Sequence, residues 1–316
     1  MGLREDPAHH PGGRGVPAGV RGRLHAVTGF LQQCFNGLVS GGFYALLALG
    51  LAVIFGMLGV VNFAHGAFFM LGAFGAYLAL AELGMPFWVA LFAVPALLFL
   101  LGMLLERTLI RRLTPFDPLY NFLLTFGLTL VLQDAVKREY GVQSQPYPRP
   151  AELSGSIDLG VFDYPAYQVF VLGAAVVLCT AVWLVLTRTR VGMVVRAATE
   201  RPELTGALGV NVGRWVTPVF AFGVALAGLA GVLAAPMRAV NPLMGADLII
   251  AVFAVVVIGG LGSVFGSVLA GFAIGVAQSL GNLYVPALSQ TLIFIIMAGV
   301  LLLRPAGLFG REEART

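Results

Sequence analysis

Residues 248–303 read LIIAVFAVVVIGGLGSVFGSVLAGFAIGVAQSLGNLYVPALSQTLIFIIMAGVLLL and contain no Asp, Glu, Lys or Arg. A second charge-free stretch, residues 24–81, is similarly long. Because a helix needs about 20 apolar residues to cross the hydrocarbon core of a bilayer, each stretch must hold two or three membrane elements. Four shorter charge-free runs predict one membrane helix each, at residues 83–105, 118–133, 164–187 and 215–237.

The composition excludes a soluble enzyme, a nucleic-acid-binding protein and a disordered regulator. Of the 316 residues, 59% are hydrophobic and 11% are charged, whereas about 25% of a soluble domain is charged. So few charges cannot cover a surface in water, so lipid must surround most of the chain. Segments that cross lipid must satisfy their own backbone hydrogen bonds. We therefore predict an all-α, polytopic transmembrane helical bundle of roughly eight to ten membrane elements, some of them broken or re-entrant.

Basic residues in short loops predict the orientation, because they gather on the cytoplasmic side of a membrane. Loop 188–214 carries five arginines and loop 106–117 carries three, so both are predicted to be cytoplasmic. Segment 134–163 holds more acidic than basic residues and is predicted to be external.

Three regions follow from this reading: a polar, disordered N-terminal tail at 1–26, a transmembrane domain at 27–305 and a cytoplasmic tail at 306–316. The N-terminal tail is rich in Arg, which favours the cytoplasm. An odd number of crossings must then lie in 24–81. Either one element there is short or broken near Gly41-Gly42, or the tail violates the rule.

Polar residues recur at a spacing of four inside two predicted helices, which puts each set on one helix face. These sets are Gln32, Asn36, Ser40 and Tyr44, and Asn121, Thr125, Thr129 and Gln133. Polar side chains that face lipid are costly, so both faces are predicted to point inward. They either line the route of a polar solute or hydrogen-bond to neighbouring helices.

Two glycine-rich breaks interrupt the long apolar stretches, GMLGVVNFAHGAFF at 56–69 and GGLGSVFGS at 259–267. Many transporters place broken helices next to the substrate. Asn62 and His65 lie in the first break, although a lone His there is more often a packing and hydrogen-bonding residue than a ligand or proton carrier. The candidate residues of a solute path are Gln32, Asn36, Ser40, Asn62, His65, Asn121, Thr125 and Thr129.

Small residues also form stripes, which let helix backbones approach closely. The candidate helix-packing residues in these stripes are Gly223, Gly231, Ser267, Gly271 and Gly275. Such a face is either a subunit interface or ordinary packing within the chain.

The sequence carries no sign of catalysis. Cys34 and Cys179 have no disulfide or metal-ligand spacing, and there is no Walker A loop, H-E-x-x-H motif or nucleophile elbow. Ion-coupled carriers usually bury an ionisable group, whereas no Asp, Glu, Lys or Arg lies well inside a predicted span. We therefore expect no catalytic residue, no bound metal and no bound cofactor, and any energy for transport must come from elsewhere.

Loop 188–214 reads RTRVGMVVRAATERPELTGALGVNVGR. Pro202 suits the first position of a helix and Gly209 suits the residue after its end, which predicts a short helix at 202–208. Leu204 and Leu208 share one face of this helix. An apolar ridge flanked by charges is typical of a segment that docks into a groove of another protein; the alternative is a solvated loop.

At this point the chain resembles a known family. The loop is similar to the ATPase-docking loop of ABC importer permeases, and three further segments resemble the branched-chain amino acid permeases of the LivH type. These segments are NFAHGAFFMLGAFGAY at 62–77, LLTFGLTLVLQD at 123–134 and GGLGSVFGSVLAGFAIGVAQSL at 259–280. The resemblance covers residues 30–310. It implies an ATPase-coupling role for Gly192, Arg196, Ala197, Glu203, Leu204, Leu208 and Gly209, with Asn211 also matching.

The resemblance further implies a non-catalytic permease subunit of an ABC importer in the bacterial cytoplasmic membrane. Its expected partners are a second, LivM-like permease, two cytosolic ATPases that hydrolyse ATP, and a periplasmic or tethered solute-binding protein. The expected cargo is a branched-chain or related amino acid. Ala67 and Gln278 stand where family members often have Glu, so urea or another short amide remains an alternative cargo. A self-sufficient secondary carrier or channel is the alternative of a different class.

Overall fold

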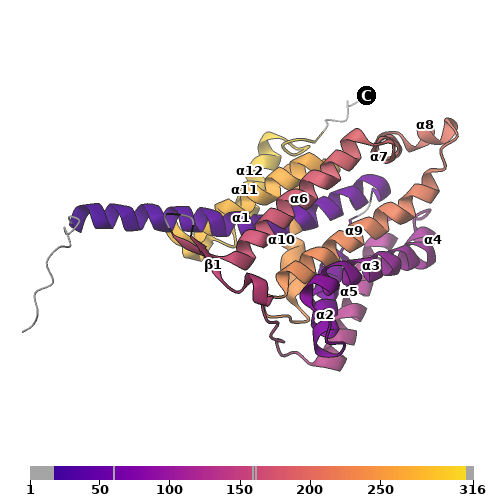
Figure 1. Ribbon diagram of the computed structural model, residues 1–316. Coiled ribbons are helices and arrows are strands. Elements are labelled where there is room, and N and C mark those ends of the chain that lie inside the picture. The colour runs from indigo at the N-terminus through magenta and orange to yellow at the C-terminus, as the bar shows by residue number, and fades with distance from the viewer. Residues whose placement is uncertain (1–17, 60, 159, 161, 311–316) are drawn as a thin grey trace, which may run out of the picture.

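The computed structural model describes residues 18–59, 61–158, 160 and 162–310, and their regular structure is almost entirely helical (Figure 1). This confirms the predicted all-α class. Residues 1–17 and 311–316, which the sequence assigned to the two tails, lie outside the described residues. The first helix begins at Ala18, inside the range assigned to the N-terminal tail.

Six helices of the described chain are long and apolar enough to cross a membrane, and three apolar helices are shorter. The long ones are α1 (Ala18–Leu58), α3 (Phe87–Leu105) with its extension, α5 (Pro118–Tyr140), α6 (Ala166–Arg188), α9 (Val212–Ala234) and α11 (Val264–Tyr284). The short ones are α2 (His65–Ala81), α10 (Met244–Gly259) and α12 (Leu292–Leu303). The remaining elements are α7 (Arg190–Glu200), α8 (Pro202–Ala207), two 3-10 turns, η2 (Ala151–Leu153) and η3 (Pro286–Leu288), and a small hairpin.

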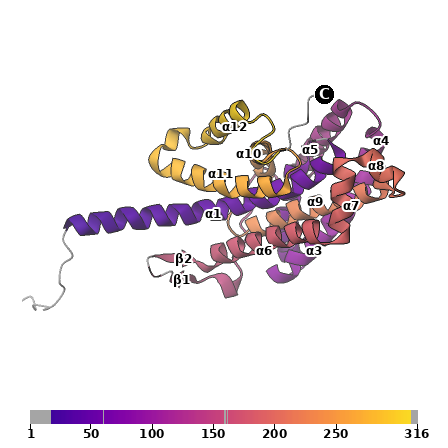
Figure 2. The ribbon, with the colours of Figure 1, turned by 90° about the horizontal axis from the view of Figure 1, so that it is seen from above.

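Helix α1 is the central element of the bundle, and α11 lies along it (Figure 2). It runs without interruption through Gly41 and Gly42, so the break considered there is absent. A Cβ atom on Gly41 would lie 2.8 Å from Phe272 Cα on α11. This glycine therefore allows close packing rather than bending the helix.

The small-residue stripe of α11 faces α1. A Cβ on Gly271 would come within 2.6 Å of Ala45 N, and one on Gly275 would collide with the backbone of Gly41. Ser267 is fully buried on the same face. The contacts of this stripe therefore lie within the chain.

The glycines of α9 make equivalent contacts on two other helices. A Cβ on Gly223 would meet Ile54 of α1 at 2.6 Å, and one on Gly231 would collide with Phe69 O of α2. The starts of α2 and α10 also meet, because Gly66 and Gly245 approach so closely that neither leaves room for a side chain. The short helices are thus held by backbone contacts to the long ones.

Helix α3 continues past its charge-free run through a π-helical segment, η1 (Glu106–Ile110), into α4 (Arg111–Leu113). It packs on α9, where a Cβ on Gly102 would lie 2.9 Å from Ala221 Cα. The sequence assigned residues 106–113 to a loop because charges start at Glu106. The helix continues because the charged side chains after Glu106 sit at its exposed end.

The bundle has two chemically different ends. The hairpin end carries β1 (Ser156–Asp158) and β2 (Asp163–Pro165), which pair antiparallel. There Tyr164 Oη donates to Asn36 Oδ1 on α1 at 2.5 Å, and burial raises the pKa of Tyr164 to about 12, so the phenol stays a donor. The Arg-rich end carries loop 188–214 and the last turn of α1, where a Cβ on Gly56 would lie 3.1 Å from Thr199 Cγ2.

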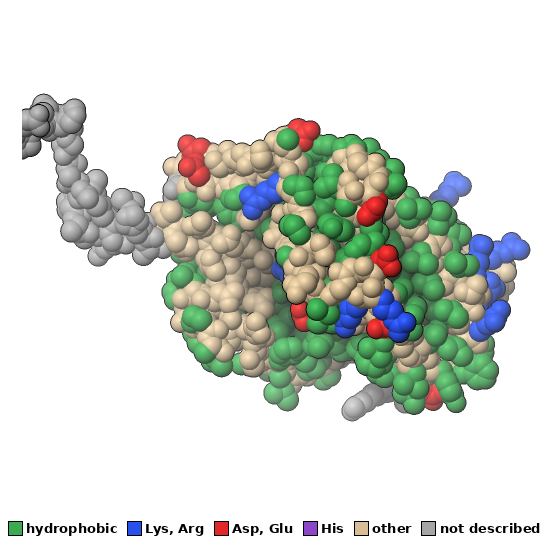
Figure 3. All heavy atoms as spheres, turned by 90° about the horizontal axis from the view of Figure 1, so that it is seen from below, with side chains coloured by type: hydrophobic (Ala, Val, Ile, Leu, Met, Phe, Trp, Pro, Cys, Tyr) green, Lys and Arg blue, Asp and Glu red, His purple; other side chains and the backbone are tan. Residues whose placement is uncertain are grey.

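Helix α1 therefore begins at the end opposite the Arg-rich loop, and residues 24–81 hold two membrane elements rather than three. Figure 3 shows hydrophobic side chains over much of one face, with charged side chains in scattered small groups. Large apolar side chains are exposed along single helices, such as Phe92 and Leu100 on α3 and Val177 on α6. A polytopic membrane protein presents such helix faces to lipid.

We expect Gly275→Ala to destabilise the protein by about 1–3 kcal/mol, because its Cβ meets backbone atoms of α1 that cannot move independently. The matched control is Gly173→Ala on α6, where a Cβ has open space and alanine favours the helix. Thermal unfolding of the purified proteins in detergent measures both. Equal midpoints for the two variants would contradict tight α1–α11 packing.

Candidate functional site

The break between α1 and α2 is fixed by His65. Its Nε2 lies 3.1 Å from Leu47 O, and a carbonyl oxygen can only accept, so Nε2 carries the proton. Its ring also occupies the space next to Gly50, where a Cβ would lie 3.0 Å from His65 Cε1. His65 thus joins α2 to the middle of α1, which is the packing role considered for it.

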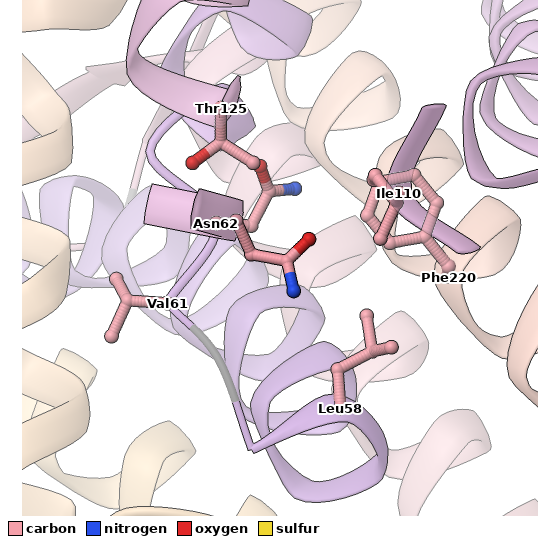
Figure 4. Close-up of a pocket in the computed structure, with 7 residues that line it drawn as sticks. Leu58, Val61, Asn62, Ile110, Thr125 and Phe220 are labelled. Atoms are coloured by element: carbon pink, nitrogen blue, oxygen red, sulfur yellow. The ribbon is translucent and has the colours of Figure 1, made fainter. Parts of the chain in front are cut away.

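Asn62 of the same break meets the polar face of α5 around a small cavity, shown in Figure 4. The cavity volume is about 10 Å³, which is room for a single water molecule. Its wall is formed by Leu58, Val61, Asn62, Ile110, Asn121, Thr125 and Phe220. The structure thus brings together three of the residues predicted for a solute path.

The polar atoms around this cavity are only partly satisfied. Thr125 Oγ1 accepts from Phe63 N at 3.3 Å, and Asn62 Oδ1 accepts from Ala64 N at 3.1 Å. Asn62 Nδ2 and Asn121 Oδ1 are buried and have no hydrogen-bond partner among the residues that the structure describes. Because an unpaired buried polar atom is costly, a free donor and a free acceptor in one small cavity fit a place that receives a polar guest.

The other residues predicted for the path lie elsewhere. Gln32 is exposed, and Asn36 is engaged by Tyr164 and by Gln33 at the hairpin end. Ser40 is half-buried on the same part of α1. A helix rises about 1.5 Å per residue, so Asn36 lies roughly 33 Å along α1 from Leu58 at the cavity. The structure therefore does not bring these three residues to Asn62.

The remaining residues of the two polar sets, Tyr44, Thr129 and Gln133, do not line the cavity. Thr129 Oγ1 donates to Thr125 O at 2.9 Å, inside α5. Tyr44 is buried, and its hydroxyl donates to Gln278 Oε1 at 2.7 Å, joining α1 to α11. Gln133 is buried with its Nε2 unpaired. Helix-to-helix hydrogen bonding thus accounts for Tyr44, and backbone bonding within α5 for Thr129.

Loop 188–214 at the Arg-rich end folds into two helices. The predicted helix at 202–208 is confirmed as α8 (Pro202–Ala207), with Gly209 in left-handed backbone at φ 85°. The preceding helix α7 is additional to the predicted one. Its buried residues are Gly192, Val195 and Ala198, and this spacing of three is the sequence signal for it.

The predicted coupling residues fall into two groups, because Gly192 is buried and the others are exposed. Thr189 Oγ1 accepts from the Gly192 N–H at 3.2 Å, and a Cβ on Gly192 would collide with Leu186 O. The exposed members include Leu204 at 54% and Leu208 at 86% accessibility. Also exposed are Arg196, Ala197, Glu203 and Gly209. Leu204 on α8 and Leu208, the residue that follows its last turn, are therefore largely exposed in the described part of the chain.

Two neighbours complete this end. Asn211, which matches the loop motif, caps α9, and its Oδ1 accepts from Arg214 N at 3.2 Å. A cavity of about 600 Å³ opens beside α7, and its wall includes Arg196, Trp183 and Ser263. Within the described ranges, no group of His, Cys, Asp or Glu could hold a metal ion.

One buried charged group was missed by sequence reasoning. Glu106 was assigned to the start of a loop, yet it is only 1% exposed and its Oε2 accepts from Thr217 Oγ1 of α9 at 2.5 Å. The predicted span ends at residue 105, so Glu106 places a buried carboxyl group at the end of that span rather than well inside it. Because Glu106 directly follows an apolar run, the linear sequence cannot distinguish a buried last turn from an exposed loop.

Comparisons with known proteins agree on a transport family. Residues 33–301 match the family described as branched-chain amino acid transport system, permease component. The permease protein BraD of the high-affinity branched-chain amino acid transport system of Pseudomonas aeruginosa is 32% identical over 90% of this chain and 97% of its own length. The corresponding permease protein LivH of Escherichia coli is 29% identical over 90% of this chain and 96% of its own.

Among solved structures, PsaBC from Streptococcus pneumoniae in complex with Fab superposes with a TM-score of 0.47 at 12% identity. It covers 87% of this chain and 90% of that one.

We expect Thr125→Val to lower the free energy of unfolding by about 1–3 kcal/mol, because the Phe63 N–H would lose its acceptor in a partly buried position. Thr129→Val is the control, since the Thr129 hydroxyl bonds only to a carbonyl of its own helix. Denaturation in detergent compares the variants. If both substitutions have the same effect, the contact between α5 and the break contributes no stability.

Proposed function

The chain belongs to the family of permease components of branched-chain amino acid transport systems, and from this we propose that it is the membrane subunit of an ATP-driven importer. The observation that carries the proposal is the uncovered Leu204–Leu208 pair on a short helix at the Arg-rich end. An apolar ridge in a charged setting suits a groove on a second protein. An importer whose permease hydrolyses no ATP needs an ATPase at such a place.

The orientation follows from charge. With five arginines, loop 188–214 belongs on the cytoplasmic side of a bacterial inner membrane. The hairpin end, with its acidic residues, would then face the external solute-binding protein. Helix α1 would begin outside, so the Arg-containing N-terminal segment is an exception to the positive-inside rule. Two cytosolic ATPases and a second, LivM-like permease would complete the complex, with no nucleic acid and no cofactor bound by this chain.

The polar cavity between the break and α5 is our candidate for part of the solute path. Asn62 offers a donor and Asn121 an acceptor, which suits a zwitterionic amino acid. A cavity of about 10 Å³ is far too small for that cargo, so this conformation is closed. Alternating access would require the break, α5 and α9 to separate. Capture of the solute belongs to the external binding protein, so no tight pocket is needed here.

Uptake by the reconstituted complex tests the proposal. Vesicles that hold the chain with its second permease and the ATPases should take up labelled leucine only when ATP is inside and the binding protein is outside. Labelled urea and glutamate in parallel vesicles distinguish the cargo. Leucine uptake by the chain alone, without ATP, would instead support a secondary carrier or channel.

We expect the double variant Leu204→Asp/Leu208→Asp to lose ATPase association, because two carboxylates would be buried in an apolar groove at a cost of several kcal/mol. The variant Leu204→Met/Leu208→Met keeps the apolar volume and should retain association. Co-purification with the ATPases measures both, and membrane insertion should be equal. Full association of the Asp variant would rule out docking through α8.

Thr125→Cys, in a background without Cys34 and Cys179, should react with a water-soluble thiol reagent faster during ATP turnover than at rest. The control is Val131→Cys, which lies on the exposed face of α5 and should be shielded by lipid in both conditions. Labelling followed by mass spectrometry gives the rates. Protection of position 125 throughout turnover would mean that the polar face of α5 serves packing only.

A further inference from the structure

We propose that the hydrogen bond between Glu106 and Thr217 is the positioning link that transmits movement of α8 to the closed cavity around Asn62. The inference rests on the proposed function, because it assumes that an ATPase moves α8. It concerns residues that neither the family resemblance nor the polar stripes singled out.

The first observation is the burial of the pair. Among the residues that the structure describes, Glu106 is the one Asp, Glu, Lys or Arg side chain classed as buried. Thr217 is buried as well, and its hydroxyl donates to Glu106 Oε2 at 2.5 Å. A carboxylate in this position is costly and is poorly explained by stability alone, since an apolar residue of the same size would pack at no such cost. The carboxylate adds a directional hydrogen bond between the end of α3 and α9.

The second observation is the continuity from α8 to Thr217. Val210 N donates to Thr205 O at 3.3 Å, so the short connector is hydrogen-bonded back onto α8. Asn211 then caps α9, and Thr217 lies in the second turn of that helix. A displacement of α8 therefore moves the start of α9, and Thr217 with it.

The third observation is the continuity from Glu106 to the cavity. Glu106 opens the π-helical segment η1, where its carbonyl accepts from Arg111 N. Ile110 ends this segment and forms part of the cavity wall, as does Phe220, about one turn after Thr217 on α9. The link thus lies one helical turn from both wall residues. π-Helical turns are often found at functional sites.

The Glu106–Thr217 hydrogen bond differs in kind from the close glycine contacts between these helices. Gly102 on Ala221 and Leu98 on Gly228 are apolar contacts, which set the distance between the helices without a hydrogen bond. A short hydrogen bond to a carboxylate is directional, so it holds the end of α3 and α9 at a fixed position along each other. A movement of α9 therefore displaces η1 and Ile110 as well.

The test compares leucine transported per ATP hydrolysed in the complete reconstituted complex. Thr217→Val keeps the shape and removes the donor, so the ratio should fall at least about fivefold while ATPase association stays normal. Thr217→Ser keeps the hydroxyl and should restore the ratio. The control is Thr114→Val at the same end of the bundle, because the Thr114 hydroxyl bonds only to Ile110 O of its own segment.

If Thr217→Val fails to assemble, Glu106→Met is the second variant to test. It removes the acceptor of the hydrogen bond together with the cost of a buried charge. It should lower the ratio as much as Thr217→Val, and the double variant should be no worse than either. An unchanged ratio in Glu106→Met, or a Thr217→Ser ratio as low as that of Thr217→Val, would overturn the link. A purely structural role would instead reduce association, hydrolysis and uptake together. Failure of the unmodified complex to transport with ATP would overturn the proposed function, and this inference with it.

Discussion

Backbone-to-backbone contact between helices is the constraint on which the rest of this structure depends. In lipid there is no hydrophobic force to press helices together, so close approach of backbones must hold the bundle. Gly41 and Gly275 provide that approach between α1 and α11, while Gly66 and Gly245 provide it between α2 and α10. Each contact leaves no room even for a methyl group. One helix is therefore held at a fixed position along the next. A displaced helix therefore has to shift as a unit, carrying with it whatever lies at its ends.

The polar features lie where these units meet. The break between α1 and α2 is held by His65 on one side and by Thr125 on the other, so it is a joint between three helices. Asn62 and Asn121 keep an unpaired donor and acceptor at that joint. Such atoms are costly when they are buried away from water, and their cost favours any movement that hydrates them. The unpaired polar atoms in its wall therefore favour opening of the closed cavity.

The Arg-rich end has the opposite character. Its apolar pair on α8 is exposed, while Thr205 of the same helix is buried and holds the connector to α9. The two-helix loop is therefore anchored on one side and uncovered on the other. Between this end and the cavity lie Glu106 and Thr217, which form a hydrogen bond between the end of α3 and α9. The connector from α8, Thr217 and the cavity-wall residue Phe220 follow one another along α9.

Features that depend on neighbours along the chain could be predicted from the residues alone. Charge-free runs required helices in lipid, Pro202 and Gly209 delimited α8, and a spacing of four assigned Asn121 and Thr125 to one face. The residues alone could not show which helix a given face packs against, or at what position along the bundle. Only the tertiary structure brought Asn62 to α5, left Asn36 at the hairpin end and buried Glu106 against Thr217. The physical reason is that periodicity records the direction in which a side chain points from its own helix. What that side chain meets is decided by packing between residues distant in sequence, here through glycines whose partners no local pattern reveals.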